Sequence, residues 1–125
     1  MKIEQIKKLF LIAALYDFVL GLIFLVAWKR MYGYFGVTLP NHDGYVQFGA
    51  ALVAIFGVGF WFVAQNPERN RDIIKMGVLL KVAYATVVLG HYFFGSIPGI
   101  WVSFAWFDLV FLGFFVAALR SLNRI

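Results

Sequence analysis

The chain has 125 residues, of which 63% are hydrophobic and 14% are charged, with a net charge of +5 and no cysteine. Because soluble domains carry roughly a quarter charged residues, this composition predicts an integral membrane protein, built as a single domain over residues 1–125. The absence of cysteine excludes disulfides and thiolate metal sites, and the placement of basic residues at the ends of apolar runs argues against a nucleic-acid partner.

Residues 9–28 form the first apolar run and follow a short charged leader, residues 1–8. About 20 helical residues cross roughly 30 Å of hydrocarbon, the thickness of a bilayer core. A basic start before an apolar run is also the signature of a signal peptide. This run, however, is long for a signal peptide, contains Asp17 and continues into Trp28 and Lys29 without a small-residue cleavage site. We therefore expect a retained transmembrane helix.

The connection at 29–44 is predicted to be a loop. It contains Gly33, Gly36 and Pro40, residue types that interrupt helices. Its aromatic residues, Tyr32 among them, are expected at the membrane interface, where aromatic side chains are enriched.

Three further apolar runs follow, each long enough to span a membrane. They predict helices over residues 45–64, 73–94 and 100–119. Pro67 is expected to end the first of these, and the side chain of Asn70 or Asp72 to cap the next. With the run at the N-terminus, they predict an all-α protein: an integral membrane four-helix transmembrane bundle.

Lysine and arginine are distributed unevenly between the predicted loops. Eight lie at the N-terminus, around the 65–75 loop and at the C-terminus, whereas Lys29 and Arg30 lie on the opposite side. Basic residues accumulate on the cytoplasmic side of membrane proteins. We therefore expect a multi-pass protein of the cytoplasmic (inner) cell membrane, with both termini cytoplasmic.

Three charged residues interrupt the apolar runs: Asp17, Lys81 and Asp108. The helical rise places each of them about 12–16 Å from the cytoplasmic end of its run, at similar depth. Three unpaired charges in hydrocarbon would be very costly, so the sequence predicts an intramembrane polar layer. Three interpretations stay open: an ion pair that fixes helix register, a site for a substrate or a proton, and pairing with another subunit.

A second, outer polar layer is predicted from Gln47 and His91, because His91 shares a helical stripe with Lys81. A His91 that is wetted at the membrane interface is the alternative. On the fourth helix, aromatic side chains share a stripe with Asp108, which places a carboxylate among rings. The residues expected to line a ligand site are Tyr84, Trp101, Phe104 and Phe111.

The sequence contains no pattern for catalysis or metal binding. Two separated histidines without cysteine do not form a metal or haem site, and neither a phosphate-binding glycine loop nor a converging Ser/His/Asp set is present. We therefore assign no catalytic residue and no metal. No cofactor is predicted, although contact with a quinone or a lipid is compatible with the composition. Enzyme activity stays open, with a non-catalytic role favoured.

Four short helices are combined with a loose polar pattern that spans most of the chain: Gln47 with Gly49, Asn66-Pro67, Gly77 with Lys81, and Asp108. In these features the chain resembles the small DoxX-like membrane proteins. The predicted cytoplasmic termini also fit this family, and the resemblance implies a role as a small membrane subunit that partners with a quinone-linked oxidoreductase. It assigns no catalytic residue.

Three functions remain, all in contact with the lipid bilayer. The favoured function is that of a small non-catalytic subunit or accessory protein of a larger membrane complex, for which a quinone-linked redox complex is the suggested type. Such a subunit would bind a protein partner or a second copy of this chain. The alternative is a binding protein or carrier for a hydrophobic or amphipathic molecule, in which Asp108 would suit an amine and Lys81 an acid or a quinone carbonyl. A proton-coupled transporter acting as a dimer is less favoured, because a lysine lies at the depth of the carboxylates.

Overall fold

The computed structural model describes residues 1–124, most of which lie in four helices. These are α1 (Ile3–Phe35), α2 (Asp43–Gln65), α3 (Arg71–Phe94) and α4 (Gly99–Asn123). No strand occurs in the described part of the chain, so the predicted all-α fold is confirmed. Each helix is long and apolar enough to cross a membrane, which makes the chain a multi-pass membrane protein.

Helix α1 begins earlier than the sequence predicted. The expected charged leader is helical from Ile3, and Ile6 and Phe10 within this first part are fully buried. Residues four apart lie on the same face of a helix, so both side chains point into the core while the lysines around them stay outside it. The leader is therefore part of the bundle.

Helix α1 also ends later than predicted, which corrects the expected loop at 29–44. It bends at Ala27, whose backbone is not helical, and continues through Gly33 to Phe35. The rings of Trp28 and Tyr32 pack 5.3 Å apart across this last part, which holds it in a helical conformation. The helix stops at Gly36, whose φ of 68° lies in the left-handed region that glycine adopts at helix ends.

The turn between α2 and α3 is held by side chains that bond backward along the chain. Helix α2 ends at Gln65, two residues before the buried Pro67, as expected. Asn70 occupies the N-cap position of α3, but its side-chain amide donates to the carbonyl oxygens of Phe62 and Asn66 at 3.0 and 2.9 Å. The predicted side-chain cap of α3 is therefore wrong, because this amide satisfies the end of α2 instead.

Helices α1 and α2 form a hairpin whose backbones nearly touch. A Cβ atom added to Gly21 would lie 2.5 Å from the backbone nitrogen of Ala54, and one added to Gly57 would lie 2.6 Å from that of Phe18. Small residues permit such close approach between membrane helices. Helices α3 and α4 form the second hairpin of the molecule.

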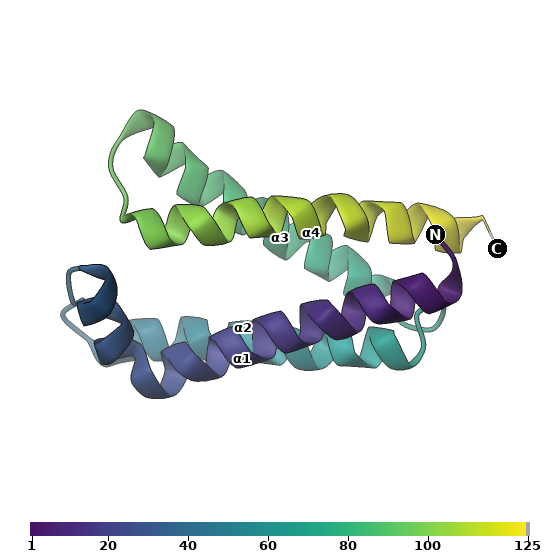
Figure 1. Cartoon of the computed structure of the whole chain (residues 1–125), viewed down its shortest axis with the longest axis horizontal. Helices are drawn as coiled ribbons and strands as arrows, with labels where there is room; N and C mark the ends of the chain where they lie inside the picture. Colours follow the sequence, from purple (N-terminus) through teal and green to yellow (C-terminus); the bar gives the residue numbers. More distant parts are fainter. Residues whose placement is uncertain (125) are drawn as a thin grey trace.

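The two hairpins join at the end of the molecule where both termini lie (Figure 1). The N-terminal ammonium donates a 2.6 Å hydrogen bond to Ser121 near the end of α4. Behind it, the rings of Phe10 and Phe115 stack at 4.5 Å, and Phe60 packs against Phe115 at 5.1 Å. Gly77 leaves room for the Phe60 ring, which would lie 2.6 Å from an added Cβ. The buried residues of this terminal core are Ile6, Phe10, Ala13, Ala14, Phe60, Val63, Ile74, Phe115, Ala118 and Leu122.

At the opposite end, α3 runs away from α2 toward the turn that follows Phe94 (Figure 1). The hairpins contact each other there mainly through aromatic side chains. Phe24 of α1 packs against Trp101 and Phe104 of α4, with ring centroids 5.6 and 6.2 Å apart, and Tyr32 packs against Trp101 at 5.7 Å. Long side chains thus bridge helices whose backbones are far apart, which leaves space between them.

Candidate functional site

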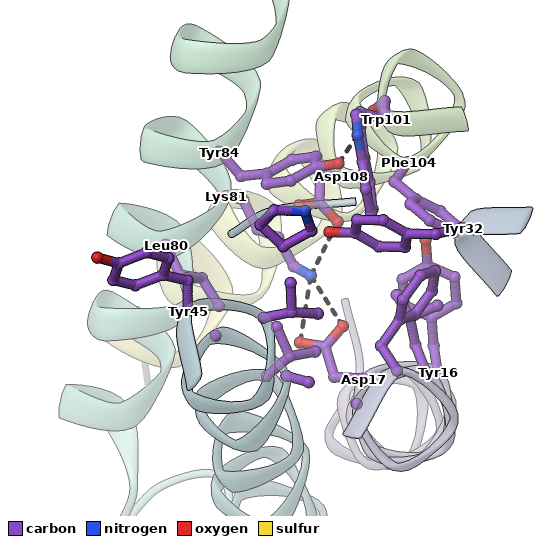
Figure 2. Close-up of a pocket in the computed structure, with 18 of the residues that line it drawn as sticks. Tyr16, Asp17, Tyr32, Tyr45, Leu80, Lys81, Tyr84, Trp101, Phe104 and Asp108 are labelled. Atoms are coloured by element: carbon purple, nitrogen blue, oxygen red, sulfur yellow. Dashed lines mark hydrogen bonds and ion pairs between the residues drawn. The ribbon is translucent and has the colours of Figure 1, made fainter. Parts of the chain in front are cut away.

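The three charged residues in the apolar helices meet between the hairpins. The Lys81 ammonium lies 3.2 and 3.3 Å from the two carboxylate oxygens of Asp17 and 3.0 Å from Oδ1 of Asp108. Figure 2 shows the ammonium from α3 between Asp17 of α1 and Asp108 of α4. The exposed fractions of Asp17, Lys81 and Asp108 are 2%, 2% and 7%. We call these three residues the charged cluster.

Aromatic rings enclose the ammonium where the carboxylates do not. Its nitrogen lies 5.7 Å from the ring centre of Tyr16, 5.8 Å from that of Phe60 and 5.4 Å from that of Phe111. Cations within about 6 Å of a ring centre are attracted by the ring face. An ammonium has three hydrogens to donate, and three oxygens accept from it here. Because the two Asp17 oxygens belong to one carboxylate, these contacts bind the ammonium to two carboxylates, and the rings cover its remaining surface.

The two carboxylates are not equivalent. Both oxygens of Asp17 accept from Lys81, whereas Asp108 uses only Oδ1. Within residues 1–124, Oδ2 of Asp108 accepts no hydrogen bond, and the side chain of Asp108 is the most exposed of the three at 11%. Asp108 is therefore the member of the charged cluster with an unused acceptor.

A cavity of about 580 Å³ lies next to the charged cluster and is lined by residues from all four helices. Its volume falls within the range of small-molecule sites, about 300–1,000 Å³. The lining residues are mostly apolar or aromatic, with Asp17, Lys81 and Asp108 on one wall. Thr38 and Pro40 also line the cavity, and they belong to the connection between α1 and α2, which lies at the end of the molecule opposite the termini (Figure 1). The terminal core borders the charged cluster through Phe60, and Phe111 packs against that core.

Three of the four residues predicted to line a ligand site do line this cavity: Tyr84, Trp101 and Phe104. The Tyr84 hydroxyl donates to the backbone carbonyl of Trp101 at 3.0 Å, which ties α3 to α4 (Figure 2). Phe111 does not line the cavity. One turn further along α4 than Asp108, it packs against the terminal core and over the Lys81 ammonium.

The predicted outer layer of Gln47 and His91 does not form inside the bundle. Both side chains are exposed, and neither lines the cavity. On α3, Lys81, Tyr84 and Val88 face the interior, but α3 diverges from α2 toward its C-terminal end (Figure 1), and His91 belongs to the last turn of this helix. His91 therefore lies on the same face of α3 as Lys81, but beyond the part of this face that a neighbouring helix covers. The prediction of an outer polar layer was wrong.

The part of the cavity wall that α1 and α2 contribute was not predicted from the sequence. From α1 come Tyr16, Leu20, Gly21, Phe24 and Tyr32, and from α2 come Tyr45, Val46, Gly49, Ala50 and Val53. A signal was present for two of the α1 residues, because Gly21 and Phe24 follow Asp17 by four and seven positions and thus share its face. Tyr32 gave no such signal, since it was expected in a loop.

Tyr16 is a further residue that sequence reasoning missed. Its hydroxyl is buried and has no hydrogen-bond partner within the described residues. Its ring packs against Phe107 and Phe111 of α4, at 6.2 and 5.3 Å between centroids. Tyr16 precedes Asp17 and lines the cavity, so an unpaired polar group lies beside the charged cluster.

No family model, curated protein sequence or solved structure matches this chain. The resemblance to DoxX-like proteins stays a prediction. The function is therefore inferred from the geometry and the charges of the site.

Proposed function

We propose that the protein binds an amphipathic small molecule within the membrane, in the cavity between its two hairpins. The observation that carries this proposal is the combination of a 580 Å³ cavity with a charged cluster on one of its walls. The apolar body of the ligand would pack against the aromatic rings, and its polar group would reach the charged cluster.

The chemistry of the cavity wall supports a ligand rather than a purely structural ion pair. A structural pair needs enclosure by packed side chains, because unsatisfied buried polar groups are costly. Here an acceptor of Asp108 is unused, and Asp108 lines a cavity. A bound molecule that donates a hydrogen bond would satisfy this acceptor. A closed ion pair would leave no acceptor for a ligand to satisfy.

We further propose that the protein lies in the cytoplasmic membrane with both termini on the cytoplasmic side. The eight basic residues predicted for that side, against Lys29 and Arg30 opposite, support this orientation. The terminal core would then close the bundle toward the cytoplasm, and the cavity would extend toward the outer face, where Thr38 and Pro40 lie.

The role as a subunit of a quinone-linked complex, suggested by the DoxX-like resemblance, stays a prediction, since no contact of the described chain argues for it. A proton-coupled dimeric transporter is less well supported. Such a mechanism uses a membrane carboxylate that is free of a compensating lysine, and Lys81 contacts both Asp17 and Asp108.

A comparison of cavity-filled and control variants tests the binding proposal. Gly49 lines the cavity, and an added Cβ there would meet open space, so Gly49→Phe should occupy the cavity without disturbing the backbone. Gly113→Phe on α4 is the matched control, because Gly113 also has open space around it but does not line the cavity. Each protein is extracted in mild detergent, and the molecules that co-purify are identified by mass spectrometry.

We expect a small molecule to co-purify with the unmodified protein and with Gly113→Phe, and to be depleted at least about tenfold in Gly49→Phe. Equal amounts in all three preparations, or none in the unmodified protein, would contradict binding in this cavity.

A further inference from the structure

We propose that the ligand of this cavity is a lipophilic ammonium ion, which is bound by Asp108 and takes the place of a proton on the charged cluster. This inference rests on the proposed function and specifies the class of its ligand. It follows from the excess of carboxylates over cations, from the hydrogen bonds already made by Lys81, and from the aromatic lining of the cavity.

The hydrogen bonds of Lys81 favour a ligand that donates a hydrogen bond. An acidic ligand or a quinone carbonyl would have to accept a hydrogen bond from Lys81, but this ammonium already donates to both Asp17 and Asp108. Lys81 is also 2% exposed and surrounded by rings. What the charged cluster offers to the cavity is an acceptor, Oδ2 of Asp108. When both carboxyl groups are ionised, the ligand that fits this oxygen is a hydrogen-bond donor.

The charge of the cluster favours a cationic donor. Two ionised carboxylates and one ammonium sum to a net charge of −1, and an uncompensated charge in a membrane interior is very costly. The cluster can reach neutrality by holding one proton on a carboxyl group or by binding one monovalent cation. Exchange of these two preserves neutrality: the ligand ammonium enters, and one proton leaves to solvent. A carboxylate ligand would instead raise the negative charge.

The groups that face Asp108 do not supply the missing positive charge. Tyr16 and Asp17 approach from α1, and Lys81 and Tyr84 approach from α3. Lys81 is the only cation in this set, and it is shared with Asp17. Tyr45 of α2 also lines the cavity, but its hydroxyl points away from the charged cluster (Figure 2). The second cation must therefore come from the ligand.

The aromatic lining then selects among donors. A hydroxyl group could also donate to Asp108, but only a cation gains from the faces of nearby rings in a desolvated site. Trp101 and Phe104, which come from the same helix as Asp108, line the cavity together with Phe24. These rings suit an ammonium ion whose remaining structure is apolar.

Three probes with one apolar body and different polar groups test the ligand class: naphthylethylamine, naphthylethanol and naphthylacetate. Their binding to the purified protein in mild detergent is measured by calorimetry, in two buffers with different heats of ionisation, so that proton release is counted directly. We expect the amine to bind at least about tenfold more tightly than the alcohol or the acid, because hydrogen bonds to charged groups are the stronger ones. Its binding should release up to one proton.

The variant Asp108→Asn removes the negative charge of this side chain but keeps its size, so it tests the charge independently of the shape of the cavity. It leaves Asp17 and Lys81 as a neutral pair, so we expect the amine to lose about 10- to 100-fold in affinity and the proton release to disappear. Binding of naphthylethanol should change little. A merely structural role of Asp108 would instead weaken both probes together. Circular dichroism checks that the variant is folded, and the measurements on the unmodified protein decide the question if it is not.

The outcomes distinguish this inference from the proposed function. If the alcohol or the acid binds as tightly as the amine, or if no proton is released, the ligand class is wrong while the binding function stands. If no probe binds to the unmodified protein, or if Gly49→Phe binds each probe as tightly as the unmodified protein does, both proposals fail.

An ammonium group can belong to a free amine or to a lipid headgroup. The amine titration is therefore repeated in bilayer nanodiscs of phosphatidylcholine, with and without added phosphatidylethanolamine. The choline group has no N–H donor, whereas the ethanolamine group does. Competition by phosphatidylethanolamine would support the ligand class with a lipid as its source, and unchanged binding of the amine would support it with a free amine as its source.

Discussion

Lys81 is stable in an apolar helix because carboxylates reach it from both hairpins. Asp17 and Asp108 lie on α1 and α4, and each contacts the ammonium within 3.3 Å. Breaking a buried ion pair by removing one partner is strongly destabilising, since the remaining charge is left uncompensated. The loss of Lys81 would leave two carboxylates together without a cation.

We expect Lys81→Met to lower the free energy of unfolding by about 3–5 kcal/mol. The matched triple variant Asp17→Leu, Lys81→Met, Asp108→Leu should recover most of this loss, because well-packed apolar residues can replace a buried charged set. Reversible unfolding in mixed detergent micelles, followed by tryptophan fluorescence, measures both.

The control for this series is Lys75→Met. Lys75 lies on the same helix, but it is exposed and pairs with Asp72 at the surface, so its removal should change stability by at most about 1 kcal/mol. A harmless Lys81→Met, or a triple variant as unstable as the single one, would show that the charged cluster does not hold the bundle together.

At the scale of the helices, the close approach of α1 and α2 positions Asp17. Asp17 lies one helical turn before Gly21, and the Gly21 backbone packs directly on that of Ala54. Any side chain at position 21 would force the two helices apart. Because the hairpin is rigid where its backbones touch, this displacement would also move Asp17 relative to Lys81.

We expect Gly21→Ala to destabilise the protein by about 1–3 kcal/mol, the usual range for overpacking a close contact. Gly90→Ala on α3 is the matched control, because a Cβ there meets open space. It should be neutral or stabilising by up to about 1 kcal/mol, since alanine favours helix more than glycine does. Thermal unfolding of the two variants compares them, and similar melting temperatures would argue against backbone contact between α1 and α2 at Gly21.

At the scale of the whole molecule, the bundle is closed at one end and hollow toward the other. The terminal core joins all four helices near the termini, whereas aromatic rings bridge the diverging hairpins elsewhere. The direction in which the cavity extends across the membrane then depends on the orientation of the protein, which the distribution of basic residues predicts.

Single cysteines introduced into this cysteine-free chain test the orientation. Leu39→Cys lies in the connection after α1, and Glu68→Cys lies in the turn after α2; both residues are exposed. In intact cells, a membrane-impermeant maleimide should label Leu39→Cys at once and Glu68→Cys only after lysis. The reverse pattern would place the termini and the terminal core on the outer side.

The sequence alone determined the class of the protein and the composition of its charged cluster. Hydropathy identified four membrane-spanning helices, because burial in hydrocarbon requires long apolar runs. Helical rise placed Asp17, Lys81 and Asp108 at similar depth, and a charge in hydrocarbon needs a partner, so their proximity could be expected.

Only the tertiary structure decided where the cavity lies and which residues line it. In a membrane helix, the lipid-facing side is as apolar as the side that faces the protein, so periodicity cannot tell where two helices separate. The divergence of α3 from α2 left His91 exposed, and the position of the terminal core drew Phe111 away from the cavity. The extension of α1 past Gly33 brought Tyr32 to the cavity wall. Each of these results depends on packing between helices that are not adjacent in sequence, which no local pattern records.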